Sequence, residues 1–148
     1  MTKSESRKRV LFLCTENSAR SQIAEVLLRT LSRGDMVTFS AGAAPAEALD
    51  RATLRLLRRH GLPVEGLTPK DLSTFAGQAF DYAITLCDRL NEKCIELPGT
   101  DSIRWSFPDP ARTEEGPTRE SAYEDYFQAL NRRLRLLILI ADKAGLAS

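Results

Sequence analysis

The stretch that decides the fold is Val10-Leu11-Phe12-Leu13-Cys14-Thr15-Glu16-Asn17-Ser18-Ala19-Arg20-Ser21. Its first four residues form a continuous apolar run, which predicts a buried strand. The run ends at Cys14, and a short polar loop then leads into an amphipathic helix that begins at Ser18. A potential nucleophile therefore ends a strand, a fixed cation opens a helix, and a polar backbone lies between them. This order predicts an enzyme that acts on a tetrahedral oxyanion.

Length, charge and cysteine content limit the number of domains, the kinds of partner and the compartment that the chain can have. The 148 residues suffice for one domain, and we expect a flexible tail over residues 1–8 and a single domain over 9–148. A formal net charge of +1 gives no electrostatic basis for binding nucleic acid or a membrane. The sequence shows no signal peptide and no membrane-spanning stretch, so we expect a cytoplasmic protein. In that reducing compartment, three cysteines favour catalytic or redox roles over a disulfide framework.

The rest of the chain alternates strands with helices. Apolar runs predict strands over residues 9–13, 36–40, 80–86 and 103–107. Helical periodicity predicts helices over residues 18–32, 45–60 and 121–144, and a short one over 72–75. Such alternation implies parallel pairing with right-handed crossovers. We therefore expect one doubly wound α/β domain, with a four-stranded parallel sheet and helices on both faces.

Three chemically capable residues follow different strands of this predicted sheet. Cys14 ends the first strand, Cys87 ends the third, and Asp109 lies just past the fourth. In parallel α/β sheets, ligands bind beyond the carboxyl ends of the strands. The topology therefore delivers two thiols and a carboxyl group to one edge of the sheet, where we expect the active site.

A cysteine attacks as its thiolate, and the surroundings of Cys14 favour that anion. The N-terminus of the following helix and the Arg20 guanidinium both supply positive charge. Loop amides can cradle an oxyanion, and Arg20 can clamp it in a bidentate manner. The residues expected to bind the oxyanion are Thr15, Glu16, Asn17, Ser18, Ala19 and Arg20, and the Ser18 and Ser21 hydroxyls can also bond the thiolate. The alternative is a buried cysteine beside an exposed arginine.

Asp109, Cys87 and Cys94 admit both a catalytic and a structural interpretation. Prolines on both sides fix the backbone of Asp109, which suits a general acid or a simple turn. Cys87 and Cys94 stand seven residues apart, unlike a CxxC pair, and a single histidine in the chain disfavours a zinc site. Either the two thiols relay a disulfide, or they are a core cysteine and an incidental surface cysteine.

Residues 10–25 resemble the phosphate-binding loop of the low-molecular-weight protein tyrosine phosphatases, because the Cys-x5-Arg-Ser spacing is kept. Ser40-Ala41-Gly42 and Asp109-Pro110 fall where that superfamily carries comparable motifs. The pair Cys87 and Cys94 is not a phosphatase feature. It resembles the thioredoxin-coupled arsenate reductases built on the same fold, and the resemblance extends over about residues 8–144.

This resemblance implies a reaction and a role for each thiol. Cys14 attacks arsenate held by the loop and Arg20, while Asp109 protonates the departing oxygen. Cys87 then attacks Cys14, which releases arsenite and leaves a disulfide. Cys94 attacks Cys87, and thioredoxin reduces the resulting Cys87–Cys94 pair. The resemblance implies no cofactor and no metal in this chain, and it implies phosphate or sulfate as competing anions.

Several polar residues are expected to support the loop. The resemblance assigns this role to Asn17, Glu25 and Ser40, next to Ser21. Some family members bind a potassium ion near the loop through an acidic residue; the resemblance places Lys70 at that position, and a shift by one residue would place Asp71 there. We expect the lysine ammonium to replace the ion. Because a carboxylate would repel an anion, we also expect Glu16 to point away from the substrate.

Two other functions fit the same residues. A phosphatase would hydrolyse phosphomonoesters through a phosphocysteine at Cys14, with Cys87 and Cys94 as spectators. A sensor that kept the fold would bind the oxyanion without turnover. Arsenate reduction is the leading hypothesis because it uses all three thiols and Asp109.

Overall fold

The strand β1 (Lys8–Cys14) is the centre of the computed structural model, which describes residues 7–86, 99–113 and 116–147. Val10, Leu11 and Phe12 have no exposed surface, as expected for an apolar strand buried on both faces. Parallel ladders join β1 to β2 (Met36–Gly42) on one side and to β3 (Tyr82–Thr85) on the other. The strand β4 (Asp101–Arg104) pairs with β3, so the strand order is β2-β1-β3-β4.

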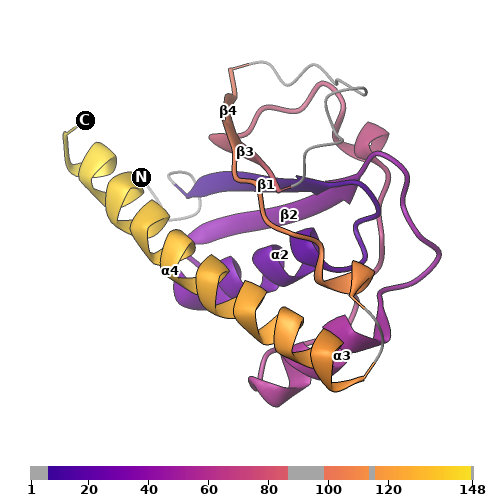
Figure 1. The fold of residues 1–148 in the computed structure, drawn as a ribbon. Helices are drawn as coiled ribbons and strands as arrows, with labels where there is room; N and C mark the ends of the chain where they lie inside the picture. Colours follow the sequence, from indigo (N-terminus) through magenta and orange to yellow (C-terminus); the bar gives the residue numbers. More distant parts are fainter. Residues whose placement is uncertain (1–6, 87–98, 114–115, 148) are drawn as a thin grey trace.

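The two faces of the sheet are covered differently (Figure 1). The helices α2 (Arg20–Leu31), α3 (Arg51–Arg59) and α4 (Pro117–Ala147) share one core with the inner side chains of β1. The opposite face packs against the 3-10 helix η1 (Leu72–Phe75). The predicted fold class is therefore confirmed: a four-stranded parallel sheet is covered by helical elements on both sides, although α2, α3 and α4 all lie on one of them. Among the described residues, no helix is both long and apolar enough to cross a membrane.

The strand order creates a crevice at the carboxyl end of β1. The chain leaves β1 for β2 on one side and later returns to β3 on the other side. Where the direction of winding reverses, the connections diverge and leave room for a ligand. Cys14 is the last residue of β1, so it stands at this point.

Two predicted helices begin later in the structure than expected. The predicted helix 18–32 begins at Arg20, because Asn17 adopts a left-handed backbone with φ of 53° and Ala19 is also non-helical. The predicted helix 45–60 is confined to α3, which begins at Arg51. Four amides between residues 43 and 50 bind carbonyl groups of the Cys14 loop, so this segment is held outside a helix; they belong to Ala43, Ala44, Ala46 and Asp50.

The last two strands are shorter than predicted, and the last helix is longer. β3 and β4 replace the strands expected over 80–86 and 103–107, and α4 replaces the helix expected over 121–144. Past β4 the chain leaves the ladder, and a further 3-10 helix, η3 (Pro110–Arg112), follows Asp109. Of the expected tail, residues 1–6 lie outside the described residues, whereas Lys8 already pairs in β1.

Candidate active site

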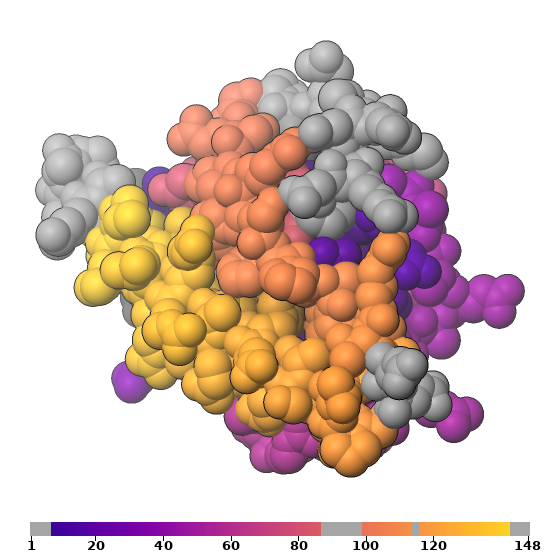
Figure 2. Space-filling view, viewed as in Figure 1, coloured from indigo at the N-terminus to yellow at the C-terminus, as the bar shows by residue number. Residues whose placement is uncertain are grey.

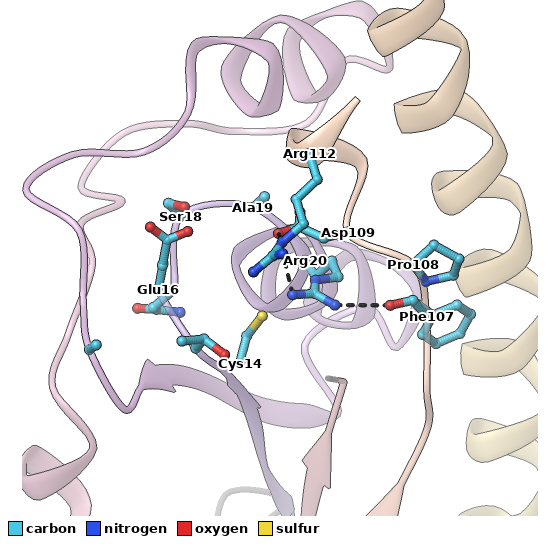
Figure 3. A pocket seen from close by; sticks show the side chains of 12 residues that line it. Cys14, Glu16, Ser18, Ala19, Arg20, Phe107, Pro108, Asp109 and Arg112 are labelled. Atoms are coloured by element: carbon cyan, nitrogen blue, oxygen red, sulfur yellow. Dashed lines mark hydrogen bonds and ion pairs between the residues drawn. The ribbon is translucent and has the colours of Figure 1, made fainter. Parts of the chain in front are cut away.

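A pocket of about 510 Å³ opens at the carboxyl end of β1. Its floor and walls come from the loop after β1 and from the segment after β4, and Figure 3 shows the sulfur of Cys14 facing the guanidinium groups across the pocket. The lining residues are Cys14, Thr15, Glu16, Asn17, Ser18, Ala19, Arg20, Ala44, Phe107, Pro108, Asp109 and Arg112. In the space-filling view, the early loop residues (indigo) are visible at the bottom of a hollow (Figure 2).

The loop turns its peptide carbonyl groups away from the pocket. The carbonyl oxygens of Cys14, Thr15 and Glu16 accept hydrogen bonds from the amides of Ala43, Ala44 and Ala46 at 3.2, 2.8 and 2.9 Å. The Ser18 carbonyl accepts from the Asp50 amide at 3.1 Å and from Thr53 Oγ1 at 3.0 Å. In a trans peptide the following N–H points the opposite way. The amides of residues 15–19 are therefore directed toward the pocket, as an anion cradle requires.

Asn17 fixes the shape of this loop from within. It is fully buried, and its Nδ2 donates to Ser21 Oγ at 2.7 Å. Its Oδ1 accepts from Gln22 Nε2 at 2.9 Å and from the Lys70 amide at 2.8 Å. A short polar side chain is among the few that tolerate the left-handed backbone found here. Asn17 and Ser21 therefore support the loop.

Gly42 allows the end of β2 to lie against the same loop. A Cβ atom at this position would stand 2.6 Å from the Thr15 carbonyl oxygen and 3.0 Å from the Asn17 Cβ. Both neighbours belong to the anion loop, and one of them is backbone. Any side chain at residue 42 would therefore displace the loop.

We expect the substitution Gly42→Ala to lower the melting temperature by about 4–10 °C, as overpacking of a core does in a chain of this size. The displaced loop should also lower kcat/KM by about 10²-fold. Thermal unfolding and steady-state kinetics measure both effects. Gly34→Ala is the control for the kinetics: its Cβ would meet no atom within 4 Å, and its φ of 80° means that the substitution should lower the melting temperature without changing kcat/KM. Unchanged kinetics in Gly42→Ala would contradict the close approach.

The Arg20 side chain links the loop to the ends of two other strands. Its Nη1 donates to the Phe107 carbonyl at 2.9 Å and to the Leu86 carbonyl at 3.4 Å, and its Nη2 lies 3.5 Å from Asp109 Oδ2. The side chain is only 9% exposed. Its buried Nε has no hydrogen-bond partner within the described part of the chain. Buried polar groups are normally satisfied, so this N–H has the capacity to donate to a ligand in the pocket.

Asp109 stands on the wall of the pocket, held by two arginines. Besides the contact with Arg20, its Oδ2 lies 3.7 Å from Arg112 Nε, and its Oδ1 accepts from the Ala111 amide at 3.0 Å. Its side chain is 14% exposed. These contacts orient the carboxyl group toward the space above Cys14 (Figure 3), where a leaving oxygen would take a proton.

Cys14 lies at the floor of the pocket and is only 4% exposed. The Tyr126 hydroxyl donates to the Arg20 carbonyl at 2.7 Å. Burial raises the pKa of Tyr126 well above its usual value, and the charge of the Cys14 thiolate adds to this increase. The tyrosine thus stays neutral and continues to anchor the start of α2.

Glu16 and Phe107 line the pocket, but their side chains point away from its interior. Figure 3 shows the Glu16 carboxylate directed away from the Cys14 sulfur, toward Ser18. The Phe107 ring also points away from the pocket and packs edge-on against Tyr126, with ring centroids 5.3 Å apart. Around the mouth, the described lining residues therefore provide no flat aromatic surface for an organic group.

A buried carboxylate connects Ser40 and Lys70 behind the loop. Glu25 Oε1 accepts from Ser40 Oγ at 2.6 Å and lies 3.7 Å from Lys70 Nζ. Glu25 Oε2 accepts from Arg29 at 2.7 Å. The Lys70 ammonium also donates to the Thr68 carbonyl at 3.1 Å. A fixed cation therefore lies beside the carboxylate, at the edge of the loop support.

The structure brings most of the predicted site residues together. Cys14, the loop residues, Arg20 and Asp109 line one pocket, whereas Cys87 and Cys94 lie outside the described residues. Sequence reasoning missed Arg112, Gln22 and Tyr126. Arg112 had a signal, since it follows Asp109 by three residues in a short turn. Within the described residues no group of three or more potential metal ligands is present.

The fold and this loop define a class of proteins, and the chain belongs to the low-molecular-weight phosphotyrosine protein phosphatase family, which it matches over residues 9–144. Within that family it is similar to arsenate reductases. The one from Bacillus licheniformis is 32% identical over 74% of this chain and 78% of its own length. The one from Oceanobacillus iheyensis is 29% identical over 95% of this chain and 99% of its own length.

A solved structure is also similar to this chain in fold and in sequence. A thioredoxin-dependent arsenate reductase from Corynebacterium glutamicum superimposes with a TM-score of 0.74 at 27% identity. The match covers 93% of this chain, and the chain spans 63% of that reductase. The superposition supports the predicted resemblance in both fold and family.

Proposed function

We propose that the protein reduces arsenate to arsenite in the cytoplasm and that thioredoxin regenerates it. The observation that carries this proposal is the similarity to arsenate reductases over nearly the whole chain, in a protein whose nucleophile lies on the floor of an anion-binding loop. Phosphate and sulfate, which share the tetrahedral shape, are expected to compete for the loop.

The first step forms a bond between sulfur and arsenic. The Cys14 thiolate attacks arsenate held by the loop amides and Arg20 Nε, and one arsenate oxygen leaves as water after taking a proton from Asp109. Arg20 and Arg112 hold the carboxyl group in position for this transfer. The product is a covalent adduct in which arsenic is still As(V).

The second and third steps move electrons through thiols. The Cys87 thiolate attacks the Cys14 sulfur; the sulfur–arsenic bond breaks, and its electron pair stays on arsenic, which leaves as As(III) arsenite. Cys94 then attacks Cys87, which frees the Cys14 thiolate and leaves a Cys87–Cys94 disulfide. A thioredoxin dithiol reduces this disulfide. Such a cycle needs a compartment in which thiols remain reduced.

The polar and charged groups of the described lining support a small inorganic anion as the substrate. The described residues at its mouth include Glu16, Ala44, Pro108 and Arg112, none of them aromatic. A carboxylate at the rim also disfavours the acidic surroundings of a phosphorylated peptide. Phosphomonoester hydrolysis remains the second candidate because the family is named for it.

The relay is tested by counting arsenite released per protein. With thioredoxin, thioredoxin reductase and NADPH, the wild type is expected to turn over many times. Cys94→Ser should release about one arsenite per chain and then stop, because Cys14 and Cys87 suffice for one cycle. Cys87→Ser should form the adduct but release almost none.

Each contrary outcome identifies another function. Full multiple turnover by both serine variants would rule out the relay. Hydrolysis of p-nitrophenyl phosphate at equal rates in the wild type and both variants, without arsenite formation, would identify a phosphatase. Arsenate binding without either reaction would identify a sensor.

We propose also that the Lys70 ammonium takes the place of a potassium ion beside the loop. The support is its position 3.7 Å from the Glu25 carboxylate, which in turn binds Ser40. A covalently attached cation neutralises the buried carboxylate without any ion from solution.

The expected result is that melting temperature and kcat/KM of the wild type are the same in potassium and sodium salts of equal ionic strength. Lys70→Gln should lower kcat/KM about fivefold, the effect of losing one interaction of about 1 kcal/mol. Lys8→Gln is the control, since Lys8 pairs with Asp81 at 3.8 Å at a distance from the loop. A specific potassium activation of the wild type would contradict this role of Lys70.

A further inference from the structure

The outer face of the second half of α4 carries large apolar side chains. Leu136, Leu139 and Ile140 are 56, 58 and 61% exposed. Among the described residues, every other large hydrophobic side chain is at least partly buried. Residues three and four apart lie on one side of a helix, so the three form a single patch. Concentrated apolar exposure of this kind marks an interaction surface.

Packing within the molecule does not account for this patch. The buried stripe of α4 consists of Leu130, Leu134, Leu137 and Ala141, which lie on the side that faces the core. The helix is therefore apolar on two sides in this region. Figure 1 shows the last turns of α4 extending past the edge of the sheet, and Figure 2 shows α4 (orange to yellow) at the molecular surface.

We propose that this face binds a second copy of the same chain, with the two α4 helices antiparallel. The argument comes from Arg135 and Asp142, which are both exposed and lie seven residues apart, hence on the same side of the helix beside Leu139. A two-fold axis passing midway between them, at residues 138–139, places Arg135 of one copy opposite Asp142 of the other. Symmetry repeats this pair, so two ion pairs flank the apolar contact.

The charges of Arg135 and Asp142 also favour the antiparallel over the parallel orientation of the two α4 helices. In a parallel pair each Arg135 would face Arg135 of the second copy, which is repulsive. In the antiparallel pair the apolar patch is centred on the same axis, since residues 136–140 surround position 138. The same register therefore aligns the apolar contact and both ion pairs.

The N-terminal residues are a poor candidate to cover the patch. The sequence of residues 1–6, Met-Thr-Lys-Ser-Glu-Ser, has one apolar side chain to offer. A membrane surface would gain the three apolar residues but would meet Asp142 at the edge of the patch. A second copy satisfies both the apolar and the charged groups.

The dimer would leave the active site open and would be weak. Tyr126, which contacts the start of α2, precedes residue 138 by 12 positions, a distance of about 18 Å along a helix. One helix pair buries less surface than a standard stable interface, so we expect association that depends on concentration.

Sedimentation equilibrium over a series of protein concentrations tests the proposal. The wild type is expected to shift from monomer to dimer as concentration rises. Leu136→Gln/Leu139→Gln should raise the dissociation constant at least about 100-fold, because apolar contacts are lost in both copies. Circular dichroism should show unchanged helix content. Activity per chain should stay at the wild-type level.

Charge reversal tests the register. Arg135→Asp is expected to raise the dissociation constant by about tenfold or more, since two pairs become repulsive. The double variant Arg135→Asp/Asp142→Arg should recover wild-type association. Arg58→Asp, at an exposed arginine of α3, is the matched control and should have no effect.

Three outcomes would overturn the proposal. They are a monomer at every concentration, dimerisation unaffected by the leucine substitutions, and failure of the charge swap to restore it. Binding of monomers to phosphatidylcholine–phosphatidylglycerol vesicles, without self-association, would instead assign the patch to a membrane surface.

Discussion

Replacement of Cys14 by serine is expected to lower arsenate reduction by about 10⁴-fold or more, as the loss of a nucleophile does in enzymes that act through one. A hydroxyl group at this position is a far weaker nucleophile than a thiolate at neutral pH. The fold should be retained, because serine is similar in size and Cys14 has only 4% of its surface exposed. Arsenite formation under thioredoxin recycling measures the effect.

The same variant should still bind the oxyanion, and at least as tightly as the wild type. Removal of the thiolate removes a negative charge from the floor of the pocket, while the amides and Arg20 remain. Phosphate should therefore raise its melting temperature in proportion to saturation. Loss of this stabilisation would show that Cys14 shapes the loop rather than serving as its nucleophile. The serine variant thus separates binding from chemistry.

The second large effect is expected from Arg20→Lys. A lysine keeps the charge but has a single nitrogen, which cannot bind the Phe107 carbonyl, approach Asp109 and donate to the substrate at once. We expect kcat/KM to fall by about 10²- to 10³-fold, similar to the loss of a positioned oxyanion donor. Single-turnover kinetics with arsenate measure the first chemical step directly.

Arg112→Lys is the matched control for Arg20→Lys. Arg112 lines the same pocket and lies 3.7 Å from the same carboxylate, but its side chain is 63% exposed. Exposed ion pairs contribute little, so we expect kcat/KM to change by less than about fivefold. Equal effects of the two substitutions would mean that charge alone, and not the fixed geometry of Arg20, is needed.

Most of the fold could be predicted because its signals are local. The apolar run before Cys14 and the alternation with amphipathic helices indicated the parallel sheet, and the Cys14-to-Arg20 spacing located the pocket. The helix predicted from residue 45 was wrong over its first six residues. Local periodicity there favours a helix, but the amides of Ala44 and Ala46 are bound by loop carbonyls that lie 29 and 30 residues earlier.

The parts of the site that could not be predicted depend on such long-range contacts. Arg20 binds the carbonyl of Phe107, which lies 87 residues away, and Tyr126 reaches the Arg20 carbonyl across 106 residues. Neither contact has a sequence pattern, since a backbone carbonyl is available at every position. The role of Gln22 could not be predicted for the same reason, because its partners include the Thr68 carbonyl at 2.9 Å.

The outward-facing carbonyls of the anion loop have a consequence for the protein in a cell. Because backbone bonds hold the loop open in advance, any tetrahedral anion of suitable size and charge can enter without rearrangement. Arsenate and phosphate are nearly alike in both respects, so binding alone discriminates poorly between them. Selectivity then comes from the reaction: two thiols can reduce arsenic, whereas phosphate can only occupy the site. Arsenate tolerance supported by this protein should therefore fall as cellular phosphate rises.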